Sequence, residues 1–179
     1  LLEAHILPQV DTPTDVRLLR VTIDTYTREK TLIAATSVRT PLLLDPDGVA
    51  LPLLKAVTCG SSEGLVTVQV GSRRWLNTLS MAVTTGRCVA VLTAADLHTG
   101  GVLANPIGAL VDCIYLGHSA WETSPGETVE VEPNFRMYLM SASAARPYSL
   151  PTAVRVRLSV IGFGCTTSAI RHCALEALL

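Results

Sequence analysis

Short apolar segments alternate with helical patterns along the middle of the chain. Residues 41–45 contain three consecutive leucines and residues 88–92 are almost wholly apolar, which is typical of strands covered on both faces of a parallel sheet. Residues 65–70 alternate in polarity and are rich in β-branched side chains, which predicts a further strand. Apolar positions at helical spacing follow at residues 49–57 and 75–83. This alternation with short connections predicts right-handed βαβ units, and hence an α/β fold with a mostly parallel central sheet.

The two helices carry signals at their ends. Pro52 is compatible with the first helix only if it lies in the first turn. Ser72 can cap the second helix, and Gly86 can end it. We expect Val57 in the first helix and Met81 in the second to face the core.

The second half of the chain predicts more strands and a closing helix. Residues 114–116 and 128–131 are read as the two strands of a hairpin around a polar stretch. Residues 135–140 and 154–161 alternate in polarity and predict single strands. The threonine pair at 166–167 can cap a last helix that runs to the C-terminus.

The composition is that of one domain with a high share of apolar residues. Of 179 residues, 49% are hydrophobic and 16% charged, which fits either a large core or extra surface buried against neighbours. The net charge of −1 points to neither nucleic acid nor an anionic membrane, and no apolar stretch reaches the ~18 residues of a membrane span. We divide the chain into a lead-in over 1–23 and one α/β subdomain over 24–179. Because it begins without Met or a basic signal-peptide region, we expect it to be a piece of a longer chain.

The segment from Arg39 to Lys55 has the layout of a phosphate-binding P-loop, with a strand, a turn containing glycine and a helix. Such a loop needs G-x-x-x-x-G-K-[ST], so that backbone N–H groups and a lysine meet the phosphates. The residues at this position are Asp45, Pro46, Asp47, Gly48, Val49 and Ala50. Two carboxylates repel anions, and the nearest lysine lies beyond Pro52. We therefore expect no nucleotide here, and a turn that only joins strand to helix.

The other chemistry of a P-loop enzyme is also missing. The third parallel strand of such ATPases ends in acidic residues that hold Mg²⁺. Here the corresponding residues are Leu92 and Thr93, and the first acid is Asp96. The five cysteines are an odd number without a C-x-x-C pair, so we interpret them as reduced thiols, and the four histidines share no metal-binding spacing. We predict no catalytic residue and no metal site.

Several segments, in order, resemble the fifth AAA+ module of the dynein heavy chain. The matched segments are residues 24–30, 39–50, 135–141, 147–151 and 157–166. The first two, DTYTREK and RTPLLLDPDGVA, resemble the family's DSFSxEN and RWPLMIDPQxQA at the same separation. FRMYLMS and PYSLP are similar to its F-[RK]-[LFM]-Y-[LI]-T-T and N-P-H-Y-x-P. The resemblance extends over residues 20–179.

This resemblance implies the large subdomain of a AAA+ module, with three layers of the P-loop NTPase type and an inserted β-hairpin. In that family the fifth module does not hydrolyse ATP, and it transmits rigid-body movement between the ATP-hydrolysing modules and the microtubule-binding stalk. The resemblance implies no cofactor in this module, with ATP and Mg²⁺ bound by other modules. The implied partners are neighbouring modules, the stalk and its strut, microtubules, and dynein intermediate and light chains.

The sequence departs from the family pattern at informative positions. Asp47 and Val49 replace glutamines, and Leu92 replaces a glutamate. These changes indicate a divergent member, which we interpret as axonemal or flagellar and as part of the cytoskeleton in the cytoplasm. The alternatives are an unrelated degenerate P-loop-fold interaction domain, or a small-molecule enzyme on a doubly wound sheet. The enzyme would need a cleft that unites several of four residues, namely His98, Asp96, Asp112 and Cys113.

Overall fold

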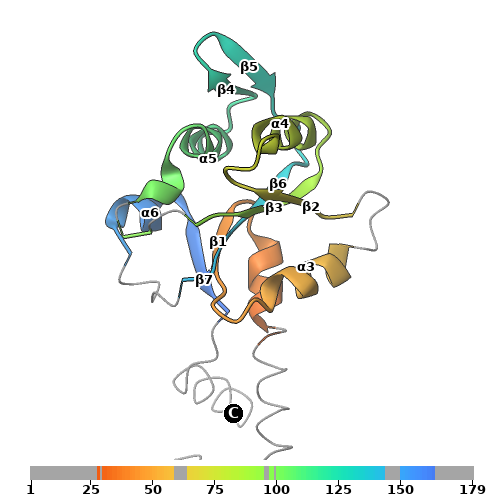
Figure 1. The fold of residues 1–179 in the computed structure, drawn as a ribbon, viewed down its shortest axis with the longest axis vertical. Helices are drawn as coiled ribbons and strands as arrows, with labels where there is room; N and C mark the ends of the chain where they lie inside the picture. The colour runs from red at the N-terminus through yellow and green to blue at the C-terminus, as the bar shows by residue number, and fades with distance from the viewer. Residues whose placement is uncertain are drawn as a thin grey trace, which may run out of the picture.

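The computed structural model describes residues 28, 30–58, 64–94, 97–98, 100–143 and 150–163. This part of the chain is a five-stranded sheet with helices on both faces and a two-stranded hairpin (Figure 1). A helical segment over 30–37 leads into the sheet. The elements that follow are β1 (Pro41–Leu44), α3 (Ala50–Thr58), β2 (Val66–Gln69), α4 (Trp75–Thr84), β3 (Cys88–Leu92), the 3₁₀ helix η2 (Gly101–Leu103), α5 (Ile107–Leu116), β4 (Ala120–Ser124), β5 (Glu127–Glu130), β6 (Arg136–Ser141), α6 (Thr152–Arg157) and β7 (Ser159–Gly162).

The central sheet is parallel throughout, in the order β2-β3-β6-β1-β7. β1 therefore has a neighbour on each side, and Leu42 is in register with Leu139 of β6 and with Val160 of β7. Every residue of β1 is buried. The order and the pairing confirm the predicted α/β fold with a mostly parallel sheet.

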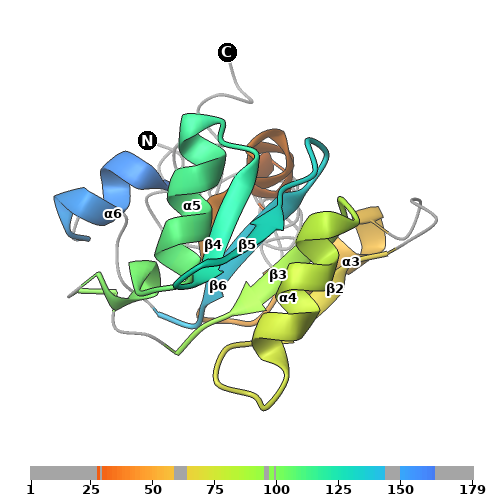
Figure 2. The same ribbon diagram turned by 90° about the horizontal axis from the view of Figure 1, so that it is seen from above.

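Successive leucines of β1 pack on opposite faces of the sheet. Leu42 and Leu44 belong to the larger core, which also holds residues of α4 and α5, whereas Leu43 packs in a second core with Ala50 and Leu54 of α3. Figure 2 shows α4 and α5 on the same face of the sheet. Burial on both faces explains why three leucines stand in a row without a polar residue between them. The three-layer architecture is thus confirmed.

The end of α4 has the predicted geometry, but its beginning does not. Gly86 has a φ of 68°, and its N–H donates to the carbonyl of Val83 at 3.4 Å, while the N–H of Arg87 donates to the carbonyl of Ala82 at 3.0 Å. This pair of hydrogen bonds is the Schellman motif, so the predicted role of Gly86 is confirmed. The predicted cap at Ser72 is wrong, because α4 begins at Trp75 without a capping side chain.

The apolar stripes of α3 and α4 are narrower than predicted. Val57 is 55% exposed and Met81 is 65% exposed, so both were wrongly assigned to the core. α3 meets the sheet through Ala50 and Leu54, one turn apart, and α4 through Leu79 and its neighbours in the next turn. Each helix packs on the sheet through a single row of buried residues, so the apolar residues beside that row are exposed to solvent.

Residues 114–116 form the last turn of α5, so the strand predicted there is wrong. The buried residues of α5 include Ile107, Leu110, Val111 and Ile114, which are spaced as one face of a helix. The three apolar residues 114–116 look like a strand only when they are read apart from the seven residues before them.

The inserted hairpin exists, but its first strand is β4, inside the stretch that was read as a polar loop. β4 pairs antiparallel with β5, and Trp121 of β4 is in register with Val129. Trp121 is fully buried, and its indole N–H donates to the carbonyl of Pro106 at 3.1 Å. Gly126 supplies the positive φ of the turn, 83°. One aromatic anchor therefore holds this otherwise polar strand against the start of α5.

The strand predicted over 154–161 is half helix. Residues Thr152–Arg157 form α6, and only Ser159–Gly162 form β7. The four residues of β7 pair in parallel with the four residues of β1, from Pro41 to Leu44. Val154 and Leu158 are buried, whereas Val156 between them is exposed, so the buried residues have the i, i+4 spacing of a helix and not the i, i+2 spacing of a strand.

Some expectations lie outside the described residues: the lead-in over 1–23 and the closing helix after 166–167. Within the described ranges, no helix has both the length and the apolar character needed to cross a membrane.

Gly108, in the first turn of α5, packs against the main chain of η2. A Cβ there would overlap the carbonyl group of Leu103, so Gly108→Ala requires a backbone shift. We expect it to lower the free energy of unfolding by about 1–3 kcal/mol, measured by urea denaturation. Gly162→Ala is the control, since a Cβ at Gly162 meets no atom within 4 Å, and its effect should be below about 0.5 kcal/mol. Equal effects of the two changes would contradict the packing argument.

Candidate functional site

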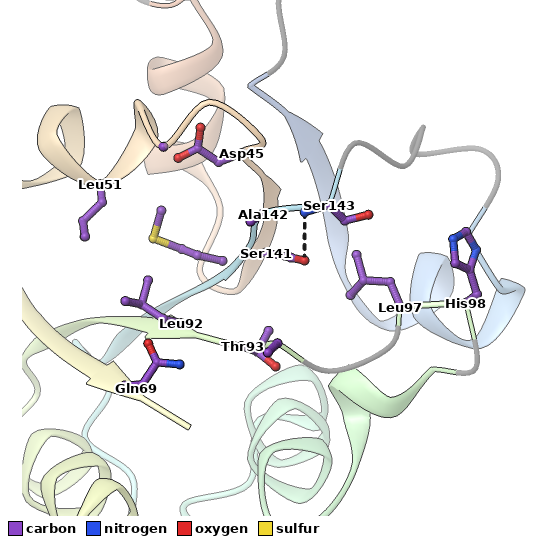
Figure 3. Close-up of a pocket in the computed structure, with 13 residues that line it drawn as sticks. Asp45, Leu51, Gln69, Leu92, Thr93, Leu97, His98, Ser141, Ala142 and Ser143 are labelled. Carbon is purple, nitrogen blue, oxygen red and sulfur yellow. Dashed lines mark hydrogen bonds between the residues drawn. The ribbon is translucent and has the colours of Figure 1, made fainter. Parts of the chain in front are cut away.

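A cavity of about 580 Å³ opens at the carboxyl ends of β1, β3 and β6 (Figure 3). From β1 the chain continues toward β2, and from β6 it continues toward β7, on the other side of the sheet. The neighbouring strands β1 and β6 therefore form the topological switch point, where open α/β sheets bind their ligands. Leu51, Leu92 and Met140 give the cavity an apolar lining, to which Asp45 and Thr93 add polar groups.

Asp45, the residue directly after β1, binds the beginning of α3. One carboxylate oxygen accepts the N–H of Val49 at 2.9 Å, and the other accepts the N–H of Ala50 at 2.8 Å. Asp45 is 5% exposed, and its own N–H donates to the carbonyl of Ser141 in β6 at 2.8 Å. In Figure 3 it lies at the start of α3, across the cavity from Leu92 and Thr93. The turn expected only to join strand to helix thus anchors that helix to the sheet.

These contacts use the donors that a P-loop would offer to phosphate. The N–H groups at a helix N-terminus and the partial positive charge there favour an anion. In this chain the carboxylate of Asp45 takes two of these donors, and Pro52, which lies in the first turn of α3 as predicted, has no N–H to offer. The N–H groups at the start of α3 therefore bind a carboxylate that belongs to the same chain.

The described residues at the end of β3, Leu92 to Ala94, include no carboxylate. Leu92 is half-buried, and the main-chain N–H of Thr93 donates to the carbonyl of Met140 at 3.0 Å. Asp45 is the only acidic residue among the described residues that line the cavity, and its two carboxylate oxygens are both hydrogen-bonded. Across the described ranges, no three His, Cys, Asp or Glu side chains are grouped as metal ligands would be.

Of the residues named in the alternative enzyme hypothesis, the three that the structure describes do not line one common cavity. His98 lines the cavity, but Asp112 forms an ion pair with Arg157 on α6. Cys113 is buried, its thiol lies 3.2 Å from the carbonyl oxygen of Ala120, and burial raises the pKa of that thiol against a smaller lowering by Arg39. A thiol with a raised pKa is a weak nucleophile at neutral pH. Asp96, the fourth residue, lies outside the described residues.

Sequence reasoning missed the two roles that Asp45 and Arg157 play. The signal for Asp45 was present, because aspartate just before a helix commonly accepts its first N–H groups. The pairing of Arg157 with Asp112, 45 residues away in sequence, had no sequence signal of its own.

Comparison with known protein families shows to which family this chain belongs. Residues 19–179 match the family described as the ATP-binding dynein motor region. The chain belongs to this family. It is an AAA module of a dynein heavy chain, as the resemblance in its motifs predicted, and dyneins are a family of cytoskeletal motors. No individual curated protein is matched.

The family description includes ATP binding, and the residues of this dynein module can be compared with what ATP needs. Neither a lysine nor a Ser/Thr stands at the helix start for phosphate and Mg²⁺, and no acid stands at the end of β3. The backbone donors at that position are engaged by Asp45. The described residues at this position therefore lack the lysine, the hydroxyl and the strand-end acid that Mg·ATP binding uses.

Asp45→Asn tests the anchoring of α3. The amide keeps the shape of the side chain but turns an NH₂ group toward a backbone N–H, so that one donor at the helix start loses its acceptor. We expect the free energy of unfolding to fall by about 1–3 kcal/mol in urea denaturation followed by circular dichroism.

Asp47→Asn is the matched control, because Asp47 lies in the same turn, is exposed and has no described side-chain hydrogen bond. Its effect should stay below about 0.5 kcal/mol. If the two variants were equally stable, the carboxylate of Asp45 would not be holding the helix.

Proposed function

We propose that this chain is a non-catalytic module of the dynein motor ring, which passes rigid-body movement between the ATP-hydrolysing modules and the microtubule-binding stalk. The observation that carries the proposal is the carboxylate of Asp45 at the start of α3. An anion bound within the chain at the phosphate position gives the module the architecture of a nucleotide-binding domain without its ligand chemistry.

The mechanical part of the proposal rests on the carboxyl edge of the sheet. Just past the regular strands, one more main-chain hydrogen bond joins each pair of neighbouring strands. The four bonds, with their donor and acceptor residues, are Val70 to Leu92, Thr93 to Met140, Asp45 to Ser141 and Phe163 to Leu44. At this edge a nucleotide-binding module would need polar groups free for its ligand. Here they tie the strands to one another, which favours movement of the sheet as one body.

Position and partners follow from the motif resemblance. We place the chain as the fifth module, in contact with its ring neighbours and with the stalk and strut, in an axonemal or flagellar dynein. Microtubules and the intermediate and light chains are partners of the whole motor in this proposal. ATP and Mg²⁺ belong to other modules.

The nucleotide part of the proposal is tested by calorimetric titration of the 179-residue chain with Mg·ATP and Mg·ADP. We expect no saturable binding up to about 1 mM, because the start of α3 is already satisfied by Asp45. A folded sample, verified by circular dichroism before and after the titration, is the control. Micromolar affinity for either nucleotide would overturn the proposal.

The mechanical part is tested by hydrogen exchange in a motor that contains this chain. We expect the amides of β1, β3 and β6 to exchange within about twofold of the same rates in ATP, ADP and nucleotide-free states, because a rigid body keeps its ladders closed. Exchange in an ATP-hydrolysing module of the same motor is the internal reference. Opening of the three strands in one nucleotide state would contradict transmission as a rigid body.

A further inference from the structure

A second cavity, of about 570 Å³, lies at the amino end of the sheet. It is formed where β1 and β7 begin and where α5 and α6 end, at the edge opposite to the Asp45 cavity. We call it the arginine groove, because its charged lining residues are Arg39, Arg155 and Arg157. Its apolar lining includes Tyr115 of α5 and Val156 of α6.

The positive charge of the groove is only partly neutralised by the described structure. Arg157 forms an ion pair with Asp112, which lies outside the groove lining. Arg39 donates to two main-chain carbonyls, those of Phe135 at 3.1 Å and Glu132 at 3.3 Å. Both acceptors are neutral, so these bonds hold the guanidinium in place without cancelling its charge.

The positive charge of Arg155 is also not neutralised by its described contact. Its described contact is with the hydroxyl of Thr152, at 3.5 Å, and its side chain is exposed. The described lining of the groove contains no carboxylate. Two guanidinium groups in one concave surface therefore have no acidic partner within the described lining, and a guanidinium is well suited to bind carboxylates with paired hydrogen bonds.

Large apolar side chains stand beside these charges. Tyr115 and Val156 are each 65% exposed, and Leu116, next to Tyr115, is 61% exposed. α5 and α6 pack against each other, so the two helices present these side chains from adjacent elements. Tyrosine and arginine are the residues that most often anchor protein–protein contacts.

The combination of guanidinium groups and exposed apolar side chains indicates which class of ligand the groove can bind. A free phosphate would satisfy the guanidinium groups but would leave the apolar side chains in water. A lipid surface is flat, whereas the charges here line a cavity. A polypeptide segment that carries both carboxylates and apolar side chains matches both properties of the groove.

We propose that the arginine groove binds an acidic polypeptide segment, whose carboxylates pair with Arg39 and Arg155 and whose apolar side chains cover Tyr115 and Val156. The proposal concerns the amino end of the sheet and does not depend on whether the Asp45 cavity binds a nucleotide. Its occupant is an acidic segment of a separate polypeptide, the arrangement that added peptides reproduce.

The test uses two fluorescein-labelled peptides that differ only in charge, one with a repeated Glu-Glu-Leu unit and one with Gln-Gln-Leu. Fluorescence anisotropy with the 179-residue chain is measured at low and at physiological salt. We expect the glutamate peptide to bind at least about tenfold more tightly than the glutamine peptide, with an affinity that falls as salt is added.

Variants then locate the binding surface. Arg155→Gln should weaken the glutamate peptide about three- to fivefold, and the double change with Val156→Ser about tenfold, because both side chains are exposed and their loss does not disturb the core. Arg155→Lys keeps the charge and should restore part of the affinity. Arg73→Gln is the matched control, since Arg73 is exposed and follows β2 at the other end of the sheet.

Three results would overturn the proposal. The first is equal binding of the two peptides, and the second is an equal loss of affinity in Arg73→Gln and Arg155→Gln. The third is displacement of the glutamate peptide by inorganic phosphate below about 1 mM or by vesicles of anionic phospholipid, which would assign the groove to another ligand. Circular dichroism of each variant separates a lost contact from a lost fold.

Discussion

The carboxylate of Asp45 fixes how the chain leaves its central strand, and much of the structure depends on that exit. β1 has a hydrogen-bonded neighbour on each side and a helix layer on each face. Because Asp45 holds the N–H groups of Val49 and Ala50, α3 begins after a connection of five residues and covers one of those faces. The bond between Asp45 N–H and Ser141 connects the same residue to β6. One buried side chain thus joins strand, neighbouring strand and helix.

The two ends of the sheet have opposite properties. At the carboxyl end, main-chain hydrogen bonds close every strand junction and an internal carboxylate meets the helix start. At the amino end, guanidinium groups and exposed apolar side chains remain available in a groove. An enzyme of this architecture places its polar chemistry at the carboxyl end. Among the described residues of this dynein module, the guanidinium groups without an acidic partner in the groove lining are at the other end.

Much of the fold could be predicted from the sequence, and the errors share a cause. β1, β2, β3 and β6 were found because each is a short apolar or β-branched run bounded by turn residues. Residues 114–116 and 154–157 were misread because a few apolar residues fit both a strand and a helix. The neighbouring residues determine which structure forms. Residues 114–116 continue a helix that begins at Ile107, and residues 154–157 belong to the helix that precedes β7. The missing lysine and strand-end acid of the candidate site were also visible in the sequence.

The sequence by itself indicated the fold class of this protein, because three leucines before an Asp-Pro-Asp-Gly turn favour a strand buried on both faces, and it showed that the P-loop lysine is absent from that turn. Only the tertiary structure decided what takes the place of the missing ligand. Whether Asp45 points to solvent or to α3 depends on the direction in which the helix packs, which is set by contacts with β1. The arginine groove is likewise tertiary, since Arg39 and Arg155 are far apart in sequence and meet only because β1 and β7 pair in parallel.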